Sequence, residues 1–204
     1  MSASSGSGTG RAKLRWWLKW TGLLLLLSGF AALAWCGFLW VRAWNFQRQA
    51  KAYLTQVLES HPARLAPVSR FRNENVLGRI DIPRVGVSSV VLQSDNEASL
   101  QLGVGHIPGT ALPGGDGNVA LAGHRDTFFR GLKDIRKNDE ILLTTPDGTY
   151  LYQVAWTRIV PPEDVGVLKD TGKPLLTLVT CYPFEYIGAA PDRFVVRAAR
   201  IGPR

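Results

Sequence analysis

The sequence has few of the residues that form disulfide bonds and zinc sites in small proteins. Its 204 residues include two cysteines, Cys36 in a long apolar run and Cys181 at the end of a strand-like segment. Two isolated cysteines exclude a disulfide framework. Histidine is also scarce, and neither cysteine has a second cysteine or histidine at ligand spacing, which argues against a structural zinc site. We therefore predict no metal and no cofactor.

The folded part of the chain also lacks net charge. The formal charge is +8, but the whole excess lies before Val76; from Val76 onward, fourteen Lys and Arg face fourteen Asp and Glu. A domain without net positive charge does not attract polyanions such as nucleic acids. We therefore predict that the protein does not bind nucleic acid.

One long stretch contains no charged residue at all. Residues 20–41 form an apolar run with tryptophans near both ends. At about 1.5 Å per residue, a helix of this length spans the roughly 30 Å hydrocarbon core of a membrane. Basic residues are concentrated before the run, so residues 1–19 are predicted to be a disordered cytoplasmic tail and the rest of the protein extracytoplasmic.

Two other interpretations of this segment were weighed. Ala32-Leu33-Ala34 fits a signal-peptide cleavage site, but the apolar run continues well past it. Lipidation of Cys36 is disfavoured because the bulky Trp35 precedes it, where a lipoprotein signal would have a small residue. An anchored helix with an inert thiol remains the favoured interpretation.

The rest of the chain divides into a juxtamembrane part and a β-rich part. Residues 42–75 are predicted to be a helix to about residue 60 and then a linker. From Val76 to Arg204, short β-rich runs alternate with Gly, Pro and Asp turns, and helical patterns occur only near Glu97–Leu102 and Thr127–Ile135. The predicted strands are Gly78–Ile82, Val85–Leu92, Asn118–Ala122, Glu140–Thr145, Thr149–Val160, Leu175–Thr180 and Arg193–Ala199. This pattern predicts an all-β domain, a closed eight-stranded barrel with one or two short helices.

Three residues near strand ends can form a reactive site. Cys181 ends an apolar strand, His124 follows another, and Arg193 begins the last. If the strands of Cys181 and Arg193 pair antiparallel across their connecting loop, Arg193 lies beside the thiol, whereas Arg197 lies about 13 Å further along. His106 is the alternative acid/base residue, expected to be structural or at the edge of a groove.

Scattered carboxylates were considered as a calcium site. They have no regular ligand spacing, so solvated loops are the better interpretation. These residues are Asp116, Glu163, Asp164 and Asp170.

The segment Thr177-Leu178-Val179-Thr180-Cys181 resembles the TLxTC signature of sortases. The flanking segments GHIPGTALPG, LAGHRDTFFRGL and CYPFEYIGAAPDRFVVRA are most similar to class D sortases, and the resemblance covers roughly residues 76–200. It implies an eight-stranded β-barrel with Cys181 as nucleophile, His124 as acid/base and Arg193 as the oxyanion-stabilising cation. Thr180 and Tyr182, which flank the nucleophile, are predicted to contact substrate.

The resemblance also implies the substrates. Sortases cleave an LPxTG-like C-terminal sorting motif between Thr and Gly and pass the acyl group to an amine, such as a peptidoglycan precursor or a pilin lysine. Two alternatives stay open at this point. The first is a membrane-anchored cysteine protease or amidase that uses water as acceptor, and the second is a membrane-tethered β-barrel that binds a partner without catalysis.

Overall fold

The computed structural model describes residues 8–59 and 76–203, and the chain divides into two compact units, Met1–Trp44 and Asn45–Arg204. The predicted linker after residue 60 lies outside the described residues. The units are therefore considered one at a time, the helical segment first and the barrel second.

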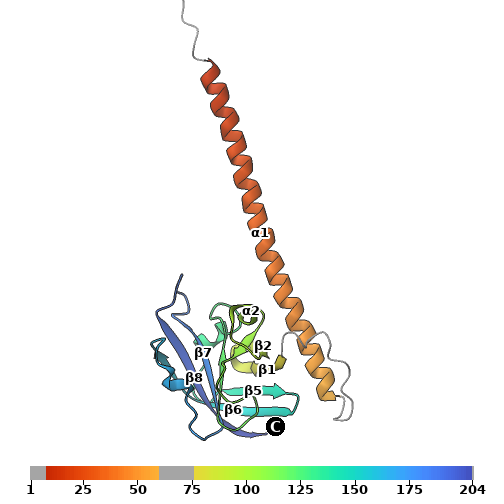
Figure 1. The fold of residues 1–204 in the computed structure, drawn as a ribbon, viewed down its shortest axis with the longest axis vertical. Coiled ribbons are helices and arrows are strands. Elements are labelled where there is room, and N and C mark those ends of the chain that lie inside the picture. The colour runs from red at the N-terminus through yellow and green to blue at the C-terminus, as the bar shows by residue number, and fades with distance from the viewer. Residues whose placement is uncertain (1–7, 60–75, 204) are drawn as a thin grey trace, which may run out of the picture. The chain divides into compact units, whose positions relative to one another are not determined.

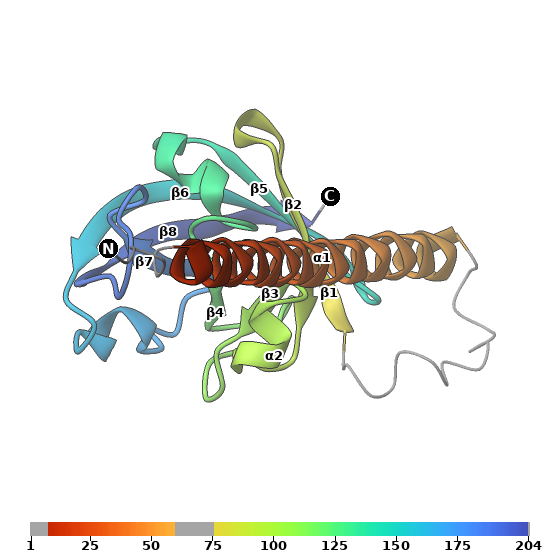
Figure 2. The ribbon, with the colours of Figure 1, turned by 90° about the horizontal axis from the view of Figure 1, so that it is seen from above.

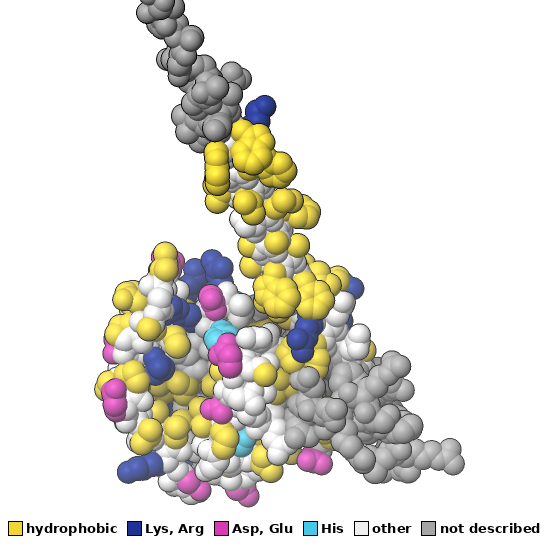
Figure 3. Space-filling view, turned by 45° about the horizontal axis from the view of Figure 1, so that its top comes forward, with side chains coloured by type: hydrophobic (Ala, Val, Ile, Leu, Met, Phe, Trp, Pro, Cys, Tyr) yellow, Lys and Arg dark blue, Asp and Glu magenta, His cyan; other side chains and the backbone are white. Residues whose placement is uncertain are grey.

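Helix α1 (Gly8–Glu59) contains the apolar run (Figure 1). Residues Lys19–Gln49 are long and apolar enough to cross a membrane, and apolar side chains cover this part of the helix in Figure 3. The expectation of disorder through residue 19 is corrected, because the helix begins at Gly8. Helix growth is cheap once a turn exists, so the helix of the apolar run extends backward through residues 11–19, most of which favour helix.

The β-rich part is a closed barrel of eight strands, as predicted. Around the ring the order is β1-β2-β3-β4-β7-β8-β6-β5, which Figure 2 shows from above. Most neighbours are antiparallel, but β2 pairs with β3 and β4 pairs with β7 in parallel. The strands are β1 (Val76–Ile82), β2 (Val87–Leu92), β3 (Val104–His106), β4 (Asn118–Ala122), β5 (Glu140–Thr145), β6 (Gly148–Val160), β7 (Leu175–Tyr182) and β8 (Asp192–Pro203).

The short helices are smaller than expected. Helix α2 covers Glu97–Leu100, and Asn96 caps it by accepting a hydrogen bond from the Ser99 amide at 2.9 Å. The second predicted helix is a 3-10 helix, η2 (Arg130–Asp134). Two further 3-10 turns, η1 (Pro83–Val85) and η3 (Val165–Leu168), lie in connections.

The barrel is filled by alternate residues of its strands. Along β7, Leu176 and Leu178 are fully buried in the core with Val196 and Ala198 of β8. Because side chains of a strand alternate between its two faces, the odd-numbered residues of β7 face away from the core. Cys181 therefore lies on the outer face of the barrel wall.

Candidate active site

Cys181 is the penultimate residue of β7 and is a partly exposed free thiol. Strand β7 lies between β4 on one side and β8 on the other. A strand held by ladders on both sides cannot shift easily, so the thiol has a fixed place on the outer face.

Arg193 lies directly opposite Cys181. The two residues are partners in the antiparallel ladder between β7 and β8. Opposite residues of such a pair have side chains on the same face and Cα atoms about 4.5–5.5 Å apart. The guanidinium donates from Nη1 to the carbonyl oxygens of Ala190 at 3.3 Å and Asp192 at 3.0 Å. The antiparallel arrangement expected from the sequence is confirmed.

The segment that carries His124 is bonded to the same strand. Beyond the end of β4, the Gly123 amide donates to Val179 at 3.2 Å, and the Thr180 hydroxyl donates to the Gly123 carbonyl at 2.7 Å. His124 therefore leaves the barrel wall close to the Cys181 end of β7. Thr180 is only 3% exposed, so its hydroxyl supports this segment from inside the barrel. Its predicted contact with substrate stays a prediction.

A carboxylate that the sequence analysis missed lies beside His124. Glu97 Oε1 of α2 is 3.8 Å from His124 Nε2, and the Glu97 side chain is 72% exposed. An exposed pair at this distance contributes little energy. No local pattern points to this carboxylate, because 27 positions separate the two residues.

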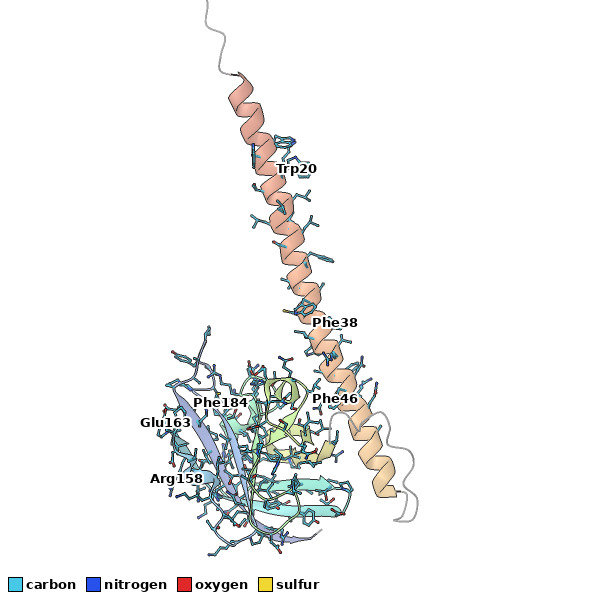
Figure 4. All side chains as sticks on the ribbon, in the orientation of Figure 1. Trp20, Phe38, Phe46, Arg158, Glu163 and Phe184 are labelled. Atoms are coloured by element: carbon cyan, nitrogen blue, oxygen red, sulfur yellow. The ribbon has the colours of Figure 1, made fainter. Side chains whose placement is uncertain are left out.

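Aromatic rings pack on the core side of the wall, at the end of β7. Tyr182 packs near Phe184 and Phe194 with ring centroids 6.1 and 6.3 Å away, and Phe184 meets Phe194 edge to face at 5.3 Å. Figure 4 labels Phe184 beyond the end of β7. Phe184 and Phe194 pack against the core, and Phe194 is the register partner of the buried Thr180, so the rings support the face of the wall opposite Cys181 and Arg193. The predicted substrate contact of Tyr182 also stays a prediction.

A buried polar cluster lies further down the same outer face. The Thr177 hydroxyl donates to Asn118 Oδ1 at 2.6 Å. Asn118 Nδ2 lies 3.2, 3.1 and 3.4 Å from the carbonyl oxygens of Val167, Leu168 and Lys169. Both side chains are at most 1% exposed. The cluster therefore fastens η3, in the β6–β7 connection, to the barrel wall.

Arg197 belongs to this cluster rather than to the reactive centre. It is 7% exposed, donates to the Val167 carbonyl, and lies over the ring of Trp156 at 5.3 Å. Burial lowers the pKa of Arg197, and the charge of Arg158 lowers it further. Its register partner is Thr177, four residues before Cys181. The guanidinium of Arg197 therefore lies beneath η3 and not beside Cys181.

His106 and three of the four scattered carboxylates have structural partners. His106 is buried in β3, and its Nε2 lies 2.9 Å from the Ala111 carbonyl oxygen. Asp116 pairs with Arg200 at 2.8 Å, while Asp164 and Asp170 accept from nearby amides. Within residues 8–59 and 76–203, no group of three or more His, Cys, Asp or Glu is placed to hold a metal ion.

Comparison with known proteins bears on the whole barrel. Residues 80–201 match the family model of the sortase domain. The chain is 33% identical over 125 residues to Sortase D of Bacillus subtilis, covering 61% of this chain and 63% of that protein. It is 35% identical over 135 residues to Sortase A of Bacillus anthracis, covering 64% and 62%. It thus spans slightly less than two thirds of these curated relatives.

Solved structures agree in fold. A Sortase D5 transpeptidase of Clostridium perfringens superposes with a TM-score of 0.58 at 27% identity, covering 74% of this chain and 89% of the other. A lid mutant of Sortase A from Corynebacterium diphtheriae gives 0.59 at 31% identity, covering 74% and 77%. The family match covers more than half of the chain and includes Cys181, His124 and Arg193. The chain belongs to the sortase family.

Proposed function

We propose that this protein is a membrane-anchored cysteine transpeptidase that cleaves an LPxTG-like sorting motif between Thr and Gly and transfers the acyl group to an amine. One observation carries the proposal: Cys181 and Arg193 face each other on one exposed wall, with the His124 segment bonded to the same strand. A nucleophile, an acid/base group and a fixed cation at one place suit acyl transfer.

The reaction divides into two half-reactions. The Cys181 thiolate attacks the threonyl carbonyl carbon, and the protonated His124 imidazole gives its proton to the glycine nitrogen as the C–N bond breaks. A thioester remains on the sulfur. The incoming amine then attacks this thioester, His124 takes the proton from the amine, and the thiolate leaves.

Arg193 supplies the charge that both tetrahedral intermediates need. Each intermediate carries an oxyanion next to the Cys181 sulfur, and the guanidinium of Arg193 comes from the residue directly opposite. Because its place is set by the strand ladder, little reorganisation accompanies the reaction. Fixed charges of this kind are typically worth about 3–4 kcal/mol of transition-state stabilisation.

The acceptor and the orientation in the membrane belong to the same proposal. We expect residues 1–19 on the cytoplasmic side and the barrel outside, where sorting-motif proteins meet an amine of the envelope or a pilin lysine. Protease added to spheroplasts should digest the barrel. Digestion of the N-terminal tail alone would contradict this orientation.

The test uses the full chain in detergent micelles with sorting-motif peptides and an amine, with products identified by mass. Wild type should give the transpeptidation product, and Cys181→Ala neither product nor thioester. If the peptide is cleaved but added amine is never incorporated, the protein is a hydrolase. If Cys181→Ala keeps the wild-type rate, Cys181 is not the nucleophile.

A further inference from the structure

The loop of residues 183–191 joins the strand of Cys181 to the strand of Arg193. Its tip reaches into solvent, with Ile187 97% exposed. An exposed residue of this kind adds little packing, so the path of the loop depends on the contacts that its other residues make. Two arginines make those contacts, one from outside the loop and one at its end.

Arg125, the residue after His124, holds the loop from outside. Its Nη2 donates to the carbonyl oxygens of Tyr186 at 2.6 Å and Gly188 at 3.1 Å. Its Cζ atom lies 6.0 Å from the centroid of the Tyr186 ring. One side chain therefore joins the segment that carries the proposed acid/base residue to the loop that follows the proposed nucleophile.

At the other end, the same loop directs Arg193. The Arg193 guanidinium donates to the carbonyl oxygens of Ala190 and Asp192. Strand β8 fixes the backbone of Arg193, but a long side chain needs partners to select one direction. Ala190 is two residues from Gly188, so a shift of the loop would move an acceptor on which the direction of this guanidinium depends.

The position of Arg125 that holds the loop has an energetic cost. Arg125 Nη1 is buried and has no hydrogen-bond partner within the described part of the chain. A buried donor without an acceptor lowers the stability of the fold. Groups that lower stability in this way tend to lie at functional sites, and this one lies next to His124.

We propose that Arg125 is a positioning residue of the transpeptidase: by holding residues 186–188 it fixes the loop that orients the Arg193 guanidinium toward the oxyanion. The inference rests on the proposed role of Arg193. It assigns Arg125 no contact with substrate. Its effect on the reaction must therefore pass through Arg193.

A double-mutant cycle tests this route. The maximal single-turnover acylation rate with a sorting-motif peptide is measured for full-length wild type, Arg125→Ala, Arg193→Ala and the double variant. A misplacement of about 1 Å can cost about 100-fold in rate, so we expect Arg125→Ala to lower the rate about 10- to 100-fold. In the Arg193→Ala background it should cost less than about threefold, because residues that act as a unit are not additive.

Three controls separate positioning from general damage. Arg130 is an exposed arginine on η2, in the β4–β5 connection that also carries Arg125. Its substitution Arg130→Ala should keep the wild-type rate. Arg125→Lys should fall between wild type and Arg125→Ala, since an ammonium reaches a carbonyl without the planar fork. Alkylation of Cys181 by iodoacetamide, followed by mass mapping, should stay unchanged in Arg125→Ala, because alkylation forms no oxyanion.

The outcomes separate this inference from the proposed function. Losses from Arg125→Ala and Arg193→Ala that multiply in the double variant would show that Arg125 acts independently, and would overturn the inference while leaving the site intact. A wild-type rate in Arg125→Ala would do the same. If Arg193→Ala itself keeps the wild-type rate, the proposed role of Arg193 fails. Should Arg125→Ala not fold, the cycle with Arg125→Lys decides.

Discussion

Thr177→Val should destabilise the barrel although it removes a single oxygen atom. Valine keeps the branched shape that suits a strand, so the backbone and packing of β7 remain. The lost atom is the hydroxyl that donates to Asn118 Oδ1 at 2.6 Å, in a site where both side chains are at most 1% exposed. Water cannot readily replace the donor, so the amide oxygen becomes a buried acceptor without a partner.

The expected loss is about 1–3 kcal/mol, the usual cost of an unsatisfied buried polar group. For a domain of this size, each kcal/mol lowers the melting temperature by about 3–5 °C. Thermal unfolding of the full chain in micelles, followed by near-ultraviolet circular dichroism, measures the change. Thr157→Val on the exposed side of β6 is the matched control and should stay within about 0.5 kcal/mol of wild type. Equal melting temperatures for the two variants would refute the reasoning.

Three further predictions concern other parts of the barrel. Gly131→Ala should destabilise by about 1–3 kcal/mol in urea unfolding, because an added Cβ would lie 2.3 Å from the Val85 carbonyl oxygen; an unchanged midpoint would contradict the close packing of η2 on η1. The hydrogen bond from Arg84 holds the pKa of Asp139 below its ordinary value of 3.8, so this carboxylate stabilises the fold above that pH and ceases to do so as pH falls through its folded pKa. Asp139→Asn should therefore be less stable than wild type at pH 7, and the gap should close below pH 3.8; a constant gap would argue against the ion pair. Arg193→Lys should acylate far more slowly than wild type because lysine lacks the donor fork, and a wild-type rate in a single-turnover assay would show that charge alone suffices.

The elements that were predicted correctly from sequence are those with a strong local pattern. Strands β4 and β5 have the predicted bounds, since apolar runs between turn residues mark them clearly. Strand β3 was missed because it has three residues, too few for an alternating pattern, and it is defined by its pairing with β2 and β4. The predicted helix near Thr127–Ile135 proved to be a 3-10 turn, where packing of Phe129 and Leu132 into the core outweighs helix propensity.

The residues of the candidate site also differ in how far their positions could be predicted from sequence. Cys181 and Arg193 could be placed together from strand parity and one short connection, and the ladder between β7 and β8 confirms that placement. The contact between Asn118 and Thr177 depends on a parallel register between strands distant in sequence. The predicted distance of Arg197 from Cys181 agrees with its register partner, Thr177. The burial of Arg197 under η3 could not be predicted, because nothing local fixes where that connection lies.

The order of strands around the ring bears on how the enzyme could be handled outside the cell. Strand β1, through which the chain enters the barrel, is four places from β7 in either direction, so it occupies the opposite wall. Strand β8 runs from Asp192 to Pro203, and Pro203 lies about 33 Å beyond Arg193 at 3.3 Å per residue. Both ends of the barrel are thus remote from the reactive thiol. A biotin tag or a resin linkage at either end would leave Cys181 open to peptides, so the proposed transpeptidation can be tested on immobilised protein.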